Sequence, residues 1–208
     1  SLGVAIKRLA FHRPHKHWQF EMFYAYTPEQ DRIGLGEQDI RAFGMFFDIQ
    51  DDEHRYQPGL RYVNSVNGQL KQQWQIMDPT KVTDREWGHG SDVEWCKWGM
   101  DSIWYGRRRP DGTADAYRFL DNARQQLCYN ETDDKINWLY FRLLIDTEKR
   151  EYVEFQSCET TYDLRGTKIN VVPPYARIRG LVNPLIWVEN DNNRRSFMYI
   201  DSAVLSQD

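Results

Sequence analysis

The residues best suited to chemistry in this chain are aromatic rings and polar side chains that alternate along short stretches. Trp138, Tyr140 and Arg142 lie two residues apart, and the amide of Asn137 precedes them. Residues separated by two point to the same face of a strand, so this spacing predicts one mixed face of rings and a guanidinium group. Sugars stack their apolar C–H faces on rings and bond their hydroxyls to amides, carboxylates and guanidinium groups. The pattern therefore favours carbohydrate contact.

Similar residues occur in two other stretches, and we predict that they belong to the same ligand-binding set. One stretch is residues 59–77, and the other lies just before Asn137. The predicted set comprises Arg61, Asn64, Trp74, Asn130, Glu131, Asn137, Trp138, Tyr140 and Arg142. The alternative is that these rings fill a second buried layer beneath long loops, since large aromatic side chains are usually buried.

A glycoside hydrolase needs paired carboxylates, and the sequence does not place such a pair. A retaining enzyme holds two carboxyl groups about 5 Å apart, one as nucleophile and one as acid. Glu151 and Glu154 are three residues apart, so they fall on opposite faces of a strand. Glu189 and Asp191 alternate correctly, but they run into a turn signal with no second Glu. We therefore favour binding over cleavage, and whether the protein is an enzyme stays open.

The enzymatic alternative is a glycoside hydrolase or a polysaccharide lyase of an unfamiliar family. A lyase would need a base beside a group that neutralises a uronate, roles that Tyr140, Arg142 and Asn137 could supply. The acids available to a hydrolase are Glu131, Glu154 and Asp48. A third alternative is an assembly domain whose aromatic residues contact protein.

Three histidines near the beginning, His12, His15 and His17, raise the question of a metal site, because imidazole binds zinc and copper. Arg13 and Lys16 interrupt this cluster and would repel a cation. We predict a solvated loop here and no metal centre.

Composition limits the function further. The chain has 208 residues, which fits a single domain over 1–208, and its net charge of −4 argues against nucleic acid as a partner. No apolar run approaches the roughly 20 residues that span a bilayer, so we expect no membrane partner. The three cysteines lack a Cys-x-x-Cys pair, which excludes the common zinc ribbons, and one disulfide or three thiols both fit. Localisation and oligomeric state stay open.

Strands must position these residues. The Asn67-Gly68 pair predicts a type I′ hairpin within residues 59–77. Residues 113–126 favour either one short helix or an irregular crossover, and residues 78–112 favour short strands within long loops. Alternation predicts further strands over residues 4–9, 18–26, 41–50, 137–146, 151–158, 175–188 and 196–205.

The second half of the chain resembles a known superfamily. Residues 138–146, the turn at 147–150, residues 151–155 and residues 162–166 follow one another as in the hairpin of concanavalin A-like lectin/glucanase sandwiches. Residues 197–205 resemble the closing strand of these sandwiches and of jelly-roll carbohydrate-binding modules. Residues 41–48 and 127–131 are similar to a bacterial family within this superfamily.

This resemblance implies an all-β, two-sheet antiparallel jelly-roll sandwich with long loops and at most one or two short helices. It also implies a glycan on a concave face and a possible structural calcium at Asp201, since related modules hold calcium near their terminal strands. No other cofactor is expected. With the residues above, it favours a carbohydrate-recognising domain of a bacterial glycan-utilisation protein, although fold alone does not establish activity.

Overall fold

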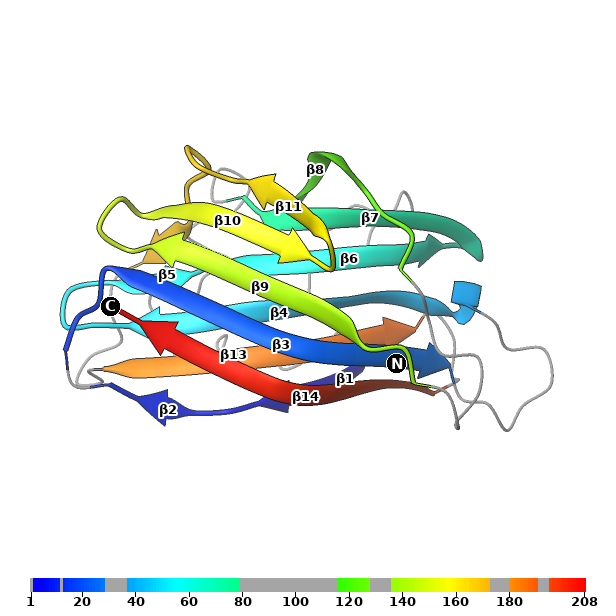
Figure 1. The fold of residues 1–208 in the computed structure, drawn as a ribbon, viewed down its shortest axis with the longest axis horizontal. Helices are drawn as coiled ribbons and strands as arrows, with labels where there is room; N and C mark the ends of the chain where they lie inside the picture. The colour runs from blue at the N-terminus through cyan, green and yellow to red at the C-terminus, as the bar shows by residue number, and fades with distance from the viewer. Residues whose placement is uncertain are drawn as a thin grey trace.

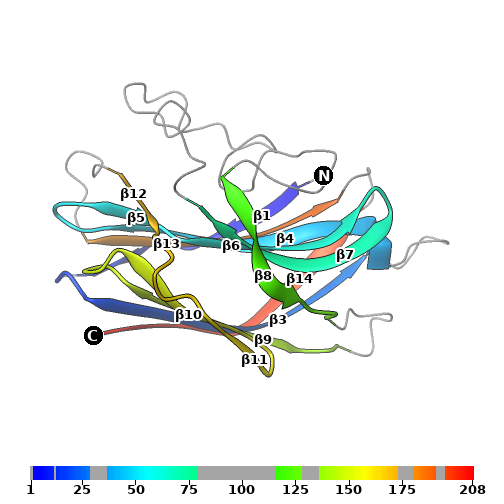
Figure 2. The same cartoon turned by 90° about the horizontal axis from the view of Figure 1, so that it is seen from above.

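The computed structural model describes residues 2–11, 13–28, 37–78, 116–127, 136–172, 180–190 and 195–208. Within these ranges the chain is almost entirely β-strand, arranged in two antiparallel sheets stacked face to face (Figures 1 and 2). The predicted all-β, two-sheet antiparallel sandwich is therefore confirmed. In the same ranges the one helical element is a short 3-10 turn, η1 (Glu37–Asp39), and no helix could cross a membrane.

The larger sheet has nine described strands, with the main order β1-β13-β4-β6-β7-β8 and with β2, β5 and β12 beside it. Its strands are β1 (Leu2–Ile6), β2 (Leu9–Ala10), β4 (Ile40–Gln50), β5 (Arg55–Gln57), β6 (Gly59–Val66), β7 (Gln69–Met77), β8 (Tyr117–Arg124), β12 (Asn170–Val172) and β13 (Leu181–Asn190).

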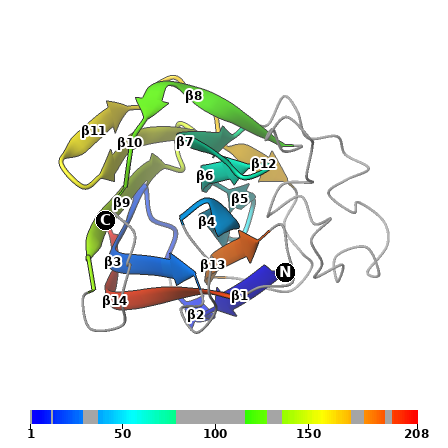
Figure 3. The same cartoon turned by 90° about the vertical axis from the view of Figure 1, so that its right-hand side faces the viewer.

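The smaller sheet has five described strands in the order β11-β10-β9-β3-β14. Its strands are β3 (His17–Pro28), β9 (Leu139–Asp146), β10 (Glu151–Ser157), β11 (Thr160–Asp163) and β14 (Ser196–Gln207). Figure 3 shows both layers end-on, with β3 and β14 in one layer and β4 and β13 in the other.

The core lies between the two sheets and follows the period-two alternation of the sequence. In β9 the residues at odd positions, from Leu139 to Ile145, are all buried in this core, while Tyr140 and Arg142 face outward and are half-buried. In β3 the even positions face inward and the odd positions face outward. The inward residues of β3 are Trp18, Phe20, Met22, Tyr24 and Tyr26. The predicted division of both strands into a core face and an outer face is therefore confirmed.

Two predicted turns are confirmed. Asn67 and Gly68 have φ angles of 51° and 75°, as a type I′ turn requires, and they join β6 to β7. The four-residue turn at 147–150 joins β9 to β10, and the Oδ1 of Asp146 accepts the Lys149 N–H at 2.9 Å.

The helical alternative for residues 113–126 is wrong where the structure describes them, because residues 117–124 form strand β8. Leu120 and Ala123 belong to the core, and the three-residue spacing that looked helical comes from an irregular strand. Asn122 has a φ of 55°, and the β7–β8 register shifts between Gln73 and Gln75. Such a bulge displaces the apolar positions from strict alternation.

The hydroxyl of Tyr152 forms a hydrogen bond between the two layers. The Oη of Tyr152, on β10, accepts the Gly59 N–H of β6 at 2.9 Å and lies 3.4 Å from the carbonyl oxygens of Gly59 and Met77. Because Tyr152 is fully buried, an unbonded hydroxyl there would be costly, and these contacts satisfy it.

Candidate functional site on the outer face of the smaller sheet

The outer face of the smaller sheet carries a group of aromatic side chains, which we call the ring face: Phe23, Trp138, Tyr140, Phe197 and Tyr199. Strand pairing places them together. Phe23 of β3 pairs with Tyr140 of β9, and the next outward position of β3, Ala25, pairs with Tyr199 of β14. Trp138 immediately precedes β9, and Phe197 lies two residues before Tyr199 on β14.

Four of these rings are unusually exposed for their size. The exposed fractions are 42% for Phe23, 45% for Trp138 and 40% for both Phe197 and Tyr199. The centroids of the Phe23 and Tyr140 rings lie 5.3 Å apart, and the Phe197 and Tyr199 rings are stacked at 6.4 Å. Clustered exposed apolar groups of this kind mark binding surfaces, whereas isolated ones do not.

Polar side chains continue the ring face along the same strands. Glu21 of β3 pairs in register with Arg142 of β9. The Tyr140 hydroxyl donates a hydrogen bond to Oε1 of Glu21 at 2.5 Å, and the Gln19 amide donates to Oε2 at 2.8 Å. Arg142 forms an ion pair with Glu154 of β10. The arrangement offers carboxylate acceptors and a guanidinium donor beside the rings.

These contacts move the pKa values of Glu21 and Tyr140 further from neutral pH. The hydrogen bond from Tyr140 lowers the pKa of Glu21, with smaller contributions from the Gln19 amide and the positive charge of Arg142. Partial burial, together with the bond to Glu21, raises the pKa of Tyr140 to about 12. At neutral pH Glu21 is therefore an ionised acceptor and Tyr140 a protonated donor, which is the wrong state for a tyrosine base.

The predicted set of ligand residues is divided by the fold. Trp138, Tyr140 and Arg142 come together on the ring face, and Asn137 adjoins Trp138 in sequence and is half-buried. Asn130 and Glu131 lie outside the described residues.

Trp74 and Asn64 do not belong to an exposed surface, so the prediction that they contact a ligand is wrong. Trp74 is fully buried in the core, and its Nε1 donates to Oε1 of Gln125 at 3.1 Å. Asn64 is also fully buried, and its Nδ2 donates to the carbonyl oxygens of Glu37 and Ile40 at 2.7 and 2.8 Å. Asn64 therefore holds the turn that leads into β4.

Arg61 lies on the outer face of the larger sheet, away from the ring face, and is likewise fully buried, which corrects its assignment as a ligand residue. Its guanidinium donates to Glu189 at 2.6 Å and to Gln75 at 2.9 Å, and lies 5.8 Å from the centroid of the Trp187 ring. Arg41 lies 3.3 Å from the same Glu189 oxygen. We call these five residues the charge row. It joins strands β13, β4, β6 and β7.

A glycine makes the charge row possible. Gly44 of β4 lies between Trp187 and Arg61 in the strand pairing. A Cβ at this position would come within 2.5 Å of the Trp187 ring and 2.7 Å of the Leu60 carbonyl oxygen. Only a glycine therefore lets the Trp187 ring lie across β4.

Each acid considered for a hydrolase that lies within the described residues is paired with an arginine. Asp48 is buried and binds Arg55 through two contacts, of 2.5 and 2.7 Å. Glu154 is paired with Arg142, and Glu189 with the two arginines of the charge row. Each carboxylate is held by a cation rather than placed opposite a second free acid.

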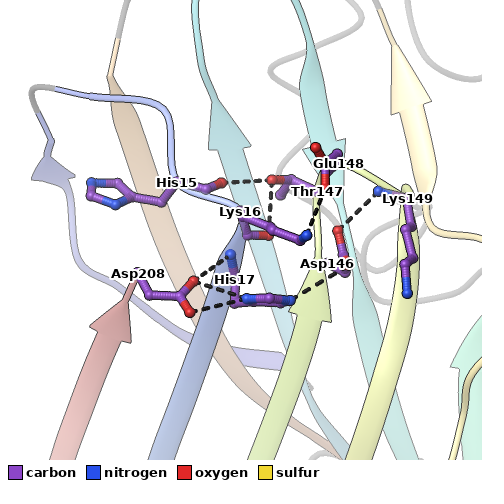
Figure 4. A network of polar contacts seen from close by, with 8 residues as sticks. All are labelled: His15, Lys16, His17, Asp146, Thr147, Glu148, Lys149 and Asp208. Carbon is purple, nitrogen blue, oxygen red and sulfur yellow. Dashed lines mark hydrogen bonds and ion pairs between the residues drawn. The ribbon is translucent and has the colours of Figure 1, made fainter.

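The histidines of the N-terminal stretch that the structure describes point in different directions (Figure 4). His17 contacts Asp208 through Nδ1 at 2.9 Å, and its Nε2 lies 3.5 Å from the buried Asp146. His15 instead packs edge-on against Phe11 and Trp18. His12 lies outside the described residues.

Asp201 lies on β14 opposite Phe23 and is exposed. Among the residues that the structure describes, no group of three His, Cys, Asp or Glu side chains could hold a metal ion. Calcium at Asp201 therefore stays a prediction.

The sequence analysis did not assign Glu21 or Phe23 to the site, and it missed Phe197 and Tyr199 altogether. Alternation along 196–205 could have shown that these two rings share a face. It could not show that β14 lies beside β3, because strand order depends on contacts far apart in sequence.

Fold and site together define an antiparallel β-sandwich with an exposed aromatic and polar face. The whole chain, residues 1–208, matches a protein family described as "Domain of unknown function (DUF6772)", and the protein belongs to that family. No curated protein sequence matches it.

Among solved structures, the chain is similar to fructofuranosidase from Schwanniomyces occidentalis complexed with fructose, at 8% identity and a TM-score of 0.32. The match covers 91% of this chain and 34% of that enzyme, so the chain spans about a third of its length. A likeness this weak defines neither a shared fold nor a shared activity.

Proposed function

We propose that this protein is a carbohydrate-recognising β-sandwich domain of a bacterial glycan-utilisation protein, which binds a polysaccharide or oligosaccharide on the ring face. The observation that carries the proposal is the group of exposed rings directly beside ionised and amide side chains. Rings supply stacking surfaces for sugar C–H groups, and Glu21, Gln19 and Arg142 supply acceptors and donors for hydroxyls. The two-sheet antiparallel architecture supports the proposed relation to concanavalin A-like sandwiches.

Binding is favoured over cleavage because the described acids are engaged. Asp48, Glu154 and Glu189 each contact arginine, and Tyr140 is held protonated. A hydrolase needs one free acid and one free carboxylate at a defined separation, and a lyase needs a deprotonated base.

The test is retention on a panel of immobilised neutral and acidic polysaccharides, with reducing ends and unsaturated products measured in the same samples. We expect retention without product. Trp138→Ala and Tyr199→Ala should each weaken binding by about tenfold, since loss of a ring–sugar contact costs roughly 1–1.5 kcal/mol. Glu53→Gln, at an exposed position on the β4–β5 turn, is the control and should bind like the parent protein.

Three outcomes would count against the proposal. Product release would identify an enzyme. Full retention by both ring variants would remove the ring face from the site. Failure to bind any glycan, with concentration-dependent self-association lost in the ring variants, would identify the face as a protein interface.

A further inference from the structure

We infer that the ring face selects uncharged, extended polysaccharides and discriminates against polymers of uronic acid. This inference rests on the proposed function and adds a ligand class to it. Three properties of the face support it: its charge, the engagement of its arginine, and its shape.

The described residues of the ring face and its polar neighbours carry a net negative charge. Glu21, Glu154 and Asp201 lie on outward positions of β3, β10 and β14, where they outnumber Arg142 among the described residues of the site. Asp163, beside Glu154 in the strand pairing, is already neutralised by Arg165 at 2.6 Å. A polyuronate laid over these carboxylates would meet like charges, whereas a neutral chain would meet hydrogen-bond acceptors.

Arg142 is the cation placed to neutralise a uronate, but its guanidinium is already paired with a carboxylate of the protein. It is paired with Glu154 and lies in register opposite Glu21. A ligand carboxylate would have to displace a carboxylate that the protein already holds in place. A sugar hydroxyl could instead add to the pair, because carboxylate oxygens accept more than one hydrogen bond.

The shape of the face favours a chain over a single sugar. Small ligands are usually enclosed in concave sites, but here Trp138 and Tyr199 keep 45% and 40% of their surface exposed. Trp138 immediately precedes β9 and Tyr199 lies on β14, so the two rings lie on either side of β3, two strand spacings or roughly 10 Å apart. A ligand that reaches both rings must therefore contain more than one sugar unit.

The experiment compares one polymer in two charge states. Hydroxyethylcellulose, a neutral β-1,4-glucan, and the same material oxidised to the carboxylate at C6 are titrated into the protein at low and at high salt. We expect the oxidised polymer to bind at least tenfold more weakly at low salt. The difference should narrow at high salt, because exposed charges are screened there.

Glu154→Gln tests the role of the arginine. Freeing Arg142 from its partner should improve binding of the oxidised polymer about fivefold relative to binding of the neutral polymer by the same variant. Glu53→Gln serves again as control and should change neither.

The outcomes separate the two proposals. Equal or tighter binding of the oxidised polymer, or tight binding confined to uronate polymers in the panel, overturns the inference while carbohydrate binding stands. Stronger binding of a single glucose unit than of the polymer overturns it as well. If no polysaccharide in the panel binds the protein, the proposed function itself is wrong.

Discussion

The hydroxyl of Tyr140 donates a 2.5 Å hydrogen bond to the Glu21 carboxylate across the β9–β3 pairing. It is the largest cause of the lowered pKa of Glu21. Tyr140→Phe keeps the ring and removes the bond, so the pKa of Glu21 should rise toward its ordinary value of about 4.3. NMR titration of the Glu21 side chain measures this directly. An unchanged pKa would show that Gln19 and Arg142 suffice.

Two tryptophans of the predicted ligand-binding set should differ in how much their truncation lowers the free energy of unfolding. Trp74→Ala empties a fully buried position and should lower the free energy of unfolding by about 3–5 kcal/mol. Trp138→Ala removes a ring that is 45% exposed and should cost less than about 1 kcal/mol. Urea denaturation of both variants tests the pair. A large loss for Trp138→Ala would mean that its ring supports the fold.

Gly44 should tolerate no side chain. Gly44→Ala places a methyl group 2.5 Å from the Trp187 ring and 2.7 Å from the Leu60 carbonyl oxygen, so it should destabilise the fold by about 1–3 kcal/mol. The matched control is Gly3→Ala on β1, whose nearest neighbour would be Val188 at an ordinary 3.7 Å. Thermal unfolding should separate the two variants, and equal melting temperatures would contradict the proposed packing of Trp187.

Removal of a buried arginine should destabilise the fold more than removal of an exposed one. Arg61→Ala leaves Glu189 without one of its partners in a fully buried position and should cost about 3–5 kcal/mol. Arg165→Ala breaks an exposed pair with Asp163 and should leave the free energy of unfolding nearly unchanged, because water screens exposed charges. Chemical denaturation is the measurement. A small effect at Arg61 would show that Arg41 alone can hold Glu189.

The contact between Asp208 and His17 predicts fraying in acid (Figure 4). The hydrogen bond from His17 lowers the pKa of Asp208. A lowered carboxyl pKa means that the contact contributes fully above the unfolded value of about 3.9 and is lost as the pH falls through the folded value. Hydrogen exchange near Lys16 and His17 should therefore accelerate below about pH 4. Asp208→Asn should show the faster exchange at neutral pH as well.

The fold could be predicted from the sequence because its signals are local. Alternation separated Leu139 and Phe141 from Tyr140 and Arg142, and Asn67-Gly68 marked a turn that only residues tolerant of positive φ readily adopt. The sequence did not predict strand β8 because a bulge breaks the alternation of apolar and polar residues by which strands are recognised.

The site was only partly predictable because burial of a polar residue depends on the whole fold. Arg61 and Asn64 look like ligand residues in sequence, yet one pairs with Glu189, 128 residues away, and the other holds a backbone turn. Phe197 and Tyr199 belong to the site only because strand β14 pairs with strand β3. No local pattern encodes such partners.

The Tyr152 hydroxyl has a mechanical consequence for the sandwich. Since it bonds to Gly59 in the opposite layer, one sheet cannot slip sideways over the other without breaking a buried hydrogen bond. Sliding of the sheets would leave the buried Tyr152 hydroxyl unsatisfied, which adds about 1–3 kcal/mol to the cost of that movement.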